Sequence, residues 1–175
     1  TNNQITANNI AFTAVEKATN GTVTGTSGID AFTVSDEVGT ENQVTANAIL
    51  FSNISSVTAG DNADTVSGSN TWNLLSTGFE TSGISFFDIV TANSTAAGTL
   101  TGTALADRFL LVAGNQLEVK TTTFTGVANV EAGNGVDEII GAADQEWQLS
   151  GTNNQITANN IAFTTVEKAT NGTVT

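Results

Sequence analysis

The opening segment of this chain, residues 1–24, returns almost unchanged as its closing segment, residues 152–175. The two segments differ at one position, where Ala14 corresponds to Thr165, and they lie 151 residues apart. Repetition at a fixed spacing is typical of repeat architectures, in which each unit packs mainly against its neighbours. We therefore expect residues 1–175 to be a single continuous domain, a window of a tandem array with a 151-residue period.

A shorter period appears in the aromatic residues, which form two interleaved series separated by 35 to 40 residues. This spacing predicts a unit of about 38 residues that contains two short strands, each centred on an aromatic residue. The first series is Phe12, Phe51, Phe86, Phe124 and Phe163, and the second is Phe32, Trp72, Phe109 and Trp147. We expect the following residues to be rungs of the core: Phe12, Phe51, Phe86, Phe124, Phe163, Trp72 and Trp147.

The composition favours strands and turns over helices. Thr, Val and Ile suit a pleated surface, and the abundant Asn and Gly adopt the left-handed conformations of tight turns. We predict an all-β fold, a right-handed parallel β-solenoid of stacked coils with about 19 residues per coil, so that each unit contains two coils. One larger coil per unit is the other arrangement. The alternative fold is a β-propeller-like repeat array, although unequal spacings suit a closed ring of equal blades less well.

The net charge of −13, from 17 acidic and four basic residues, argues against several partners. Binding to nucleic acid requires clusters of basic residues that neutralise phosphates, and an anionic membrane surface repels an acidic chain. No apolar run approaches the roughly 18 residues that a membrane-spanning helix needs. We expect no nucleic-acid partner and no membrane insertion.

Catalytic chemistry finds little support in the sequence. The chain has no His and no Cys, so its Ser residues lack the usual partner base. The adjacent acids Asp137 and Glu138 are interpreted as solvated surface. A single active site would also interrupt the repetition. We predict that the protein is not an enzyme and has no catalytic residues.

Two glycine-rich stretches, AGDNADTVS at 59–67 and AGNGVDEII at 132–140, are similar to calcium-binding nonapeptide repeats. Asp64 and Asp137 are therefore candidate calcium ligands. Calcium sites of that kind use consecutive nonapeptides, whereas these two copies are far apart in the sequence. The other interpretation is that each Asp hydrogen-bonds to its own backbone and starts a strand. We expect no other cofactor.

The Thr-x-Thr triplets at 22–24, 99–101 and 173–175 raise the hypothesis of ice binding, because flat arrays of Thr on a solenoid can order water. Such an array requires the triplets on consecutive coils. These triplets are separated by several predicted coils, so ordinary exposed strand threonines explain them better.

The phrases TWNLLSTG, NQITANNIAFTAVEKATNGTVTG and AGDNADTVSG resemble the Thr/Asn/Gly-rich repeats of giant bacterial surface proteins, among them filamentous-haemagglutinin-like exoproteins and other large secreted adhesins. The resemblance covers essentially the whole chain. It implies an extracellular β-solenoid stalk on the bacterial cell surface, acting as a fibre or in attachment and biofilm formation. Its expected partners are neighbouring repeats of the same protein, head to tail along the axis, and host or surface glycans. The alternative function is a glycan- or calcium-binding module on a solenoid face.

Overall fold

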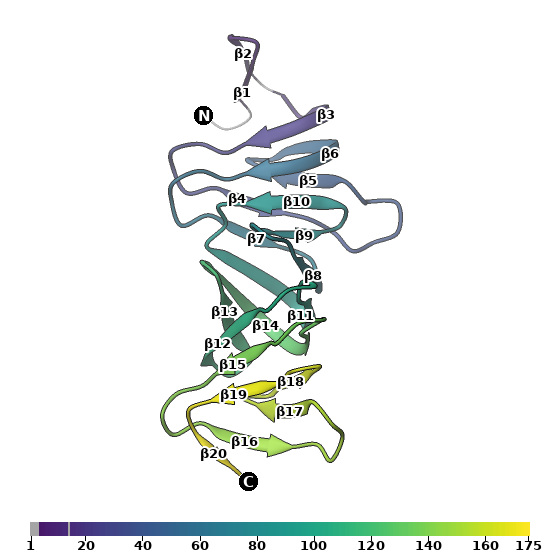
Figure 1. Ribbon diagram of the computed structural model, residues 1–175. Coiled ribbons are helices and arrows are strands. Elements are labelled where there is room, and N and C mark those ends of the chain that lie inside the picture. Colours follow the sequence, from purple (N-terminus) through teal and green to yellow (C-terminus); the bar gives the residue numbers. More distant parts are fainter. Residues whose placement is uncertain (1–3, 14) are drawn as a thin grey trace.

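The computed structural model describes residues 4–13 and 15–175 and consists of short strands wound around one long axis (Figure 1). The winding forms a β-solenoid of about five turns, with the N-terminal strands at one end and the C-terminal strands at the other. The described residues contain no helix. They therefore include no helix long and apolar enough to cross a membrane. The predicted all-β solenoid is confirmed, and the propeller alternative is not observed.

Four antiparallel three-stranded units are arranged along the axis. Their first strands are β4 (Ala31–Thr33), β8 (Thr71–Leu74), β12 (Arg108–Ala113) and β16 (Glu146–Leu149). Their second strands are β5 (Gln43–Ala46), β9 (Phe79–Thr81), β13 (Gln116–Val119) and β17 (Gln155–Ala158). Their third strands are β6 (Ile49–Thr58), β10 (Ile84–Phe87), β14 (Thr122–Glu131) and β18 (Ile161–Thr164).

The remaining strands precede, connect or follow these units. They are β1 (Gln4–Ala7), β2 (Ile10–Thr13), β3 (Lys17–Thr24), β7 (Thr65–Ser67), β11 (Thr91–Thr101), β15 (Glu138–Ile140), β19 (Lys168–Thr170) and β20 (Thr173–Val174). Parallel pairing joins one turn to the next, as in β3–β6, β4–β7, β11–β14, β12–β15 and β15–β19. Backbone hydrogen bonds between turns therefore run along the long axis of the molecule.

One turn of the solenoid is longer than the coil of about 19 residues that the sequence predicted. Residues paired in parallel on neighbouring turns are 26 to 34 positions apart in the sequence. The turn is longer because each three-stranded unit contains a strand that runs backwards. The second strand is antiparallel to the first, and only the third strand continues in the original direction. The two aromatic strands of each 38-residue repeat thus flank one hairpin excursion and do not form two separate coils.

Asparagine supplies most of the positive-φ conformations that residues other than glycine adopt in the described part of the chain. The β5–β6 loop has positive φ at Asn47 and Ala48, and the β17–β18 loop has positive φ at Asn159 and Asn160. Positive φ at both central residues is characteristic of the two-residue type I′ turn, whose twist matches that of the adjoining strands. The predicted role of Asn in these turns is confirmed.

The core follows the axis because inward and outward side chains alternate along the strands. In β14, Phe124 and Val130 are fully buried, whereas their immediate neighbours are more exposed. Of the predicted core rungs, Phe51 is partly buried and the side chain of Phe12 lies outside the described residues. The other predicted rungs are buried and belong to the hydrophobic core cluster: Trp72, Phe86, Phe124, Trp147 and Phe163.

Three aromatic contacts join one series to the other. An aromatic residue of a first strand contacts that of the third strand in the next unit at ring-centroid distances of 6.1 to 6.4 Å. The three pairs are Phe32–Phe86, Trp72–Phe124 and Phe109–Phe163. Among the described side chains, residues of the same series do not contact each other, because the sequence repeat is longer than the turn.

Replacing Phe124 with Ala should lower the free energy of unfolding by about 3–5 kcal/mol, because its fully buried ring packs against both Trp72 and Phe79. Urea unfolding followed by tryptophan fluorescence measures the change. Leu105→Ala is the control, since Leu105 is exposed and should change stability by less than about 0.5 kcal/mol. Equal effects of the two substitutions would contradict the assignment of Phe124 to the core.

Candidate functional site

Four aspartates precede strands that stack on one another in pairs. Each closes a six-residue segment that contains a glycine at its first or second position, and each is buried. Asp30 and Asp64 precede β4 and β7, and Asp107 and Asp137 precede β12 and β15. Because β4 pairs with β7 and β12 with β15, the structure brings the aspartates together as two pairs and leaves the calcium candidates Asp64 and Asp137 in different pairs.

The first aspartate of each pair closes its own loop. Oδ2 of Asp30 accepts hydrogen bonds from the backbone N–H of Thr26 at 2.5 Å and from its hydroxyl at 3.1 Å. Asp107 accepts the equivalent two bonds from Thr103 at 2.6 and 2.9 Å. The interpretation that an Asp here bonds to local backbone and starts a strand therefore describes this first aspartate.

The second aspartate of each pair bonds to the neighbouring turn. Oδ1 of Asp64 accepts the backbone N–H of Asp30 at 2.6 Å, and Oδ1 of Asp137 accepts that of Asp107 at 2.8 Å. Both side chains are fully buried, and the Oδ2 atom of each has no hydrogen-bond partner among the described residues. These two oxygens are the unsatisfied polar groups of the site.

The glycines of the segments have a steric role. A Cβ atom at Gly25 would overlap the carbonyl oxygen of Ala59 on the next turn, and one at Gly102 would overlap that of Ala132. Close approach of two backbones admits only glycine. The stretches similar to calcium-binding repeats contain glycines of the same kind, because a Cβ atom at Gly60 would lie 2.7 Å from the carbonyl oxygen of Thr26 and one at Gly133 would lie 2.2 Å from that of Thr103.

Three acidic residues form a ladder through successive turns. Asp137 accepts the N–H of Asp107, and Oε2 of Glu167 in turn accepts the N–H of Asp137 at 2.9 Å. Burial raises the pKa of the Asp137 carboxyl above its ordinary value; the hydrogen bond from Asp107 opposes this, and the charges of Asp107 and Glu167 reinforce it.

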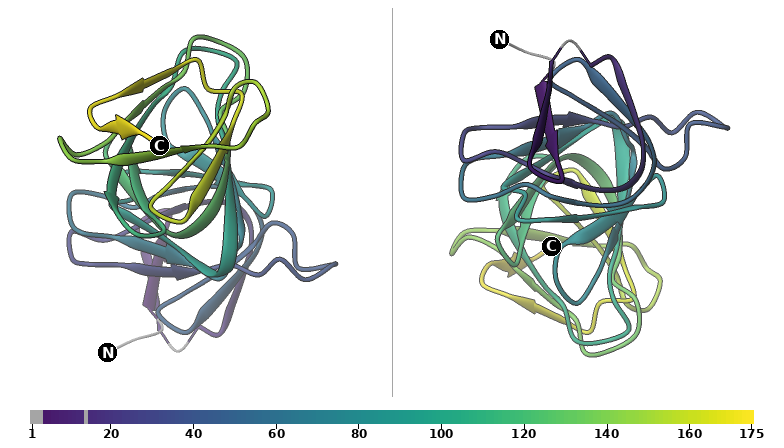
Figure 2. Two further views of the ribbon diagram at one scale, coloured as in Figure 1. Left: turned by 90° about the horizontal axis from the view of Figure 1, so that it is seen from below. Right: turned by 90° about the horizontal axis from the view of Figure 1, so that it is seen from above.

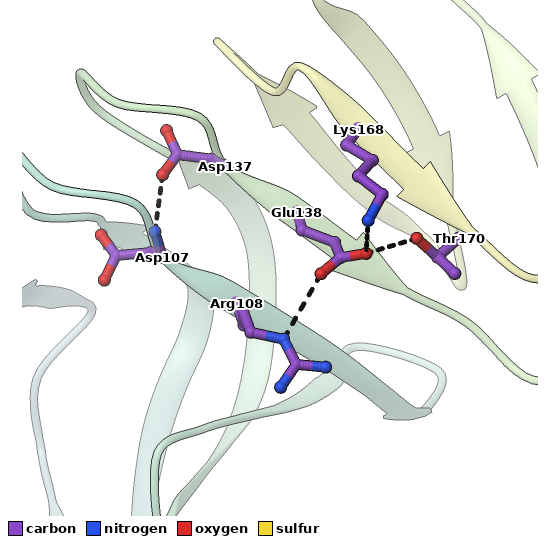
Figure 3. A network of polar contacts seen from close by, with 6 residues as sticks. All are labelled: Asp107, Arg108, Asp137, Glu138, Lys168 and Thr170. Carbon is purple, nitrogen blue, oxygen red and sulfur yellow. Dashed lines mark hydrogen bonds and ion pairs between the residues drawn. The ribbon is translucent and has the colours of Figure 1, made fainter.

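The next residue on each of these strands faces outward and forms a ladder of alternating charge (Figure 3). Arg108, Glu138 and Lys168 are paired in register on β12, β15 and β19. Oε2 of Glu138 lies 3.4 Å from Nε of Arg108, and its Oε1 lies 2.6 Å from Nζ of Lys168. Hydrogen bonds from Lys168 and Thr170, together with the positive charges, lower the pKa of Glu138 to about 2.

The interpretation of Asp137 and Glu138 as a solvated pair was wrong for Asp137. Alternation along β15 places Asp137 on the inner side and Glu138 on the outer side, where 17% of its side chain is exposed. The signal was present as three charged dipeptides, DR at 107–108, DE at 137–138 and EK at 167–168, which recur every 30 residues. The 30-residue spacing predicts that these dipeptides stack on one another only when the length of one turn is already known.

The described residues contain no group of three or more His, Cys, Asp or Glu side chains arranged around a common metal position. Asp64 and Asp137 therefore stay candidate calcium ligands that the structure leaves untested. The Thr-x-Thr triplets lie on β3, on β11 and at β20, none of which pairs with another. The structure therefore does not bring the three triplets together.

Comparison with protein-family models, with curated proteins and with solved structures found no match for this chain. The resemblance to bacterial surface adhesins rests on the residues of the chain alone.

Glu138→Gln should remove a contribution to the free energy of unfolding that the original protein loses at low pH. The pKa of Glu138 is lower in the folded protein than its ordinary 4.5, so its contribution is fully present above pH 4.5 and is lost as the pH falls towards about 2. Urea midpoints measured between pH 7 and pH 2 should fall less steeply below pH 4.5 in the variant. Glu37→Gln, in the exposed β4–β5 loop, is the control and should follow the original protein. Parallel curves for all three proteins would contradict the charge ladder.

Calcium should leave the melting temperature unchanged, because Oδ1 of both Asp64 and Asp137 already accepts a backbone N–H inside the core. Thermal melting with and without about 10 mM calcium tests this, because even weak protein calcium sites bind at about 0.1 to 1 mM. Asp64→Asn and Asp137→Asn keep an acceptor for the buried N–H and serve as matched variants. A calcium-dependent rise that disappears in these variants would establish the metal site.

Proposed function

We propose that this chain is a structural segment of a bacterial surface fibre or adhesin, where it acts as a rigid extracellular stalk. The observation that carries the proposal is the parallel pairing that continues from turn to turn, from β3–β6 at one end to β16–β20 at the other. Continuous pairing makes a stalk rigid, because bending or stretching the solenoid must break many backbone hydrogen bonds together.

The core supports the same function. Buried apolar residues from Val23 to Val166 form a single cluster, so no break in packing divides the described solenoid into segments that hinge. The aromatic contacts link successive repeats, for example Phe32 with Phe86 and Phe109 with Phe163. Such contacts make each repeat depend on its neighbours, which is the energetic basis of a cooperative rod.

The hydrogen bonds and ion pairs of the charged residues favour a structural role over a catalytic one. The acids of the buried ladder are occupied by backbone N–H groups, and Glu138 is held between two cations. These groups fix the register of adjacent turns: Asp107 and Asp137 on the inside, and Arg108 and Lys168 on the outside.

Electron microscopy of the native assembly, with gold-labelled antibodies to this chain, tests the stalk. We expect label along thin extracellular fibres with an axial repeat of about 24 Å, which is five turns at about 4.8 Å each. Antibody pre-absorbed with the chain is the control and should leave the fibres unlabelled. Label confined to the cell interior, or to globular particles, would contradict the proposal.

A further inference from the structure

Two positions in the middle of the chain depart from the sequence repeat. The residue after the first-series aromatic is Phe87 in β10, but it is Ser or Thr in the other three-stranded units. The turn between the second and third strands begins with Lys120 after β13, but with Asn or Ser in the other units. The other units have Ser52, Thr125 and Thr164 at the first position, and Asn47, Ser82 and Asn159 at the second. The fold requires neither departure, because those units form the same three strands without it.

The structure brings the two departures together in one pocket. The pocket has a volume of about 250 Å³ and lies between the β8–β9 loop, the β10–β11 loop and the β13–β14 turn. Its lining combines an aromatic ring, two charged side chains and several hydroxyl groups. These are Phe87, Asp88, Lys120, Ser76, Thr77 and Thr121.

The ring of Phe87 forms an apolar wall of this pocket. Phe86 is fully buried, so the alternation along β10 places Phe87 on the outer face, where it is partly exposed. Gly78 lets the β8–β9 loop pass close to the ring. A Cβ atom at Gly78 would overlap the carbonyl oxygen of Phe86 and lie 3.1 Å from Cδ1 of Phe87.

Lys120 and Asp88 supply one positive and one negative charge. Nζ of Lys120 donates hydrogen bonds to the carbonyl oxygen of Leu75 and, at 3.0 Å, to that of Ser76. An ammonium group has three N–H donors, so one is left for a ligand. Asp88 is exposed and lines the same pocket, where its two carboxylate oxygens are acceptors. The pocket therefore offers a donor, acceptors and an apolar surface, and these two charges cancel.

Hydrogen bonds between turns hold the walls of the pocket in place. The hydroxyl of Thr122 donates to the carbonyl oxygen of Ile89 at 2.8 Å, which joins the start of β14 to the loop that carries Asp88. The bonds from Lys120 join the β13–β14 turn to the β8–β9 loop in the same way. A site that is already ordered loses less entropy when it binds a ligand.

We propose that this pocket binds one neutral sugar ring of a polysaccharide. A pyranose ring has an apolar face of C–H groups, which packs on Phe87, and a rim of hydroxyl groups, which need both the acceptors of Asp88 and the donor of Lys120. The pocket is smaller than the volumes of about 300 Å³ and above that hold drug-sized ligands, as a single ring requires. The net charge of −13 disfavours an anionic sugar. This binding activity goes beyond the stalk function and does not depend on it.

Saturation-transfer-difference NMR with soluble methyl glycosides tests the site. The neutral probes are the methyl glycosides of glucose, galactose, mannose, fucose and N-acetylglucosamine, and methyl glucuronide is the anionic comparison. We expect at least one neutral probe to bind with a Kd of about 1 mM, and methyl glucuronide to bind more weakly. Absence of binding by all five neutral probes, or tighter binding of the glucuronide, would overturn the proposal.

The position of the bound sugar is measured on the original protein labelled with ¹⁵N. The neutral probe that binds should shift the backbone amide signals of residues 76–78, 87–88 and 120–122 more than the others. Shifts confined to other parts of the chain would place the sugar elsewhere and would reject this pocket.

A substitution that restores the repeat separates binding from folding. Phe87→Thr introduces the residue that Thr125 and Thr164 provide in other units, so it should fold, and it should weaken binding at least about fivefold. Leu110→Thr is the matched control, because Leu110 is 41% exposed on β12 and lies outside the pocket. It should bind as the original protein does. Equal affinities of the two folded variants would contradict the role of Phe87.

The charged residues are tested by the same kind of substitution. Asp88→Asn introduces the residue that Asn53 provides in another unit, where it also has positive φ. Lys120→Asn introduces the residue that Asn47 and Asn159 provide. Each should weaken binding of the neutral probe while the circular-dichroism spectrum stays that of the original protein. Unchanged affinity in both variants would overturn the assignment of the polar groups.

Discussion

The backbone pairing between successive turns is the interaction on which the rest of this structure depends. Parallel pairing places each residue over one on the next turn, so the inward and outward alternation of one strand is transmitted to its neighbour. The continuous core results from this transmission, as do the buried ladder at Asp107, Asp137 and Glu167 and the outer ladder at Glu138. Glycine at Gly25 and Gly102 lets the turns approach closely enough for the pairing to form.

The aromatic spacing located the strands correctly, because the residues of the second series lie on β4, β8, β12 and β16 and those of the first series on β2, β6, β10, β14 and β18. The length of one turn did not follow from the same pattern. A hairpin strand that runs backwards has the same alternation as one that runs forwards, so the sequence does not distinguish a hairpin from a further coil. Phe79 illustrates a second limit: it contacts Trp72, Phe86 and Phe124, yet it lies outside both aromatic series.

The polar groups were harder to predict than the core. Burial of Asp137 depends on which face of the adjoining three-residue strand is inside, and one charged neighbour gives no indication of that. The partners of Glu138 come from the preceding and the following turn, a spacing that the longer aromatic repeat conceals. Neighbouring turns, more than local sequence, decide the environment of a residue.

The mismatch between repeat and turn also shapes the outside of the molecule. The aromatic repeat of 35 to 40 residues exceeds the 26 to 34 residues between paired positions on neighbouring turns, so successive three-stranded units are displaced around the axis. End-on views show loops projecting to several sides (Figure 2). The outside of the molecule is therefore uneven on more than one side.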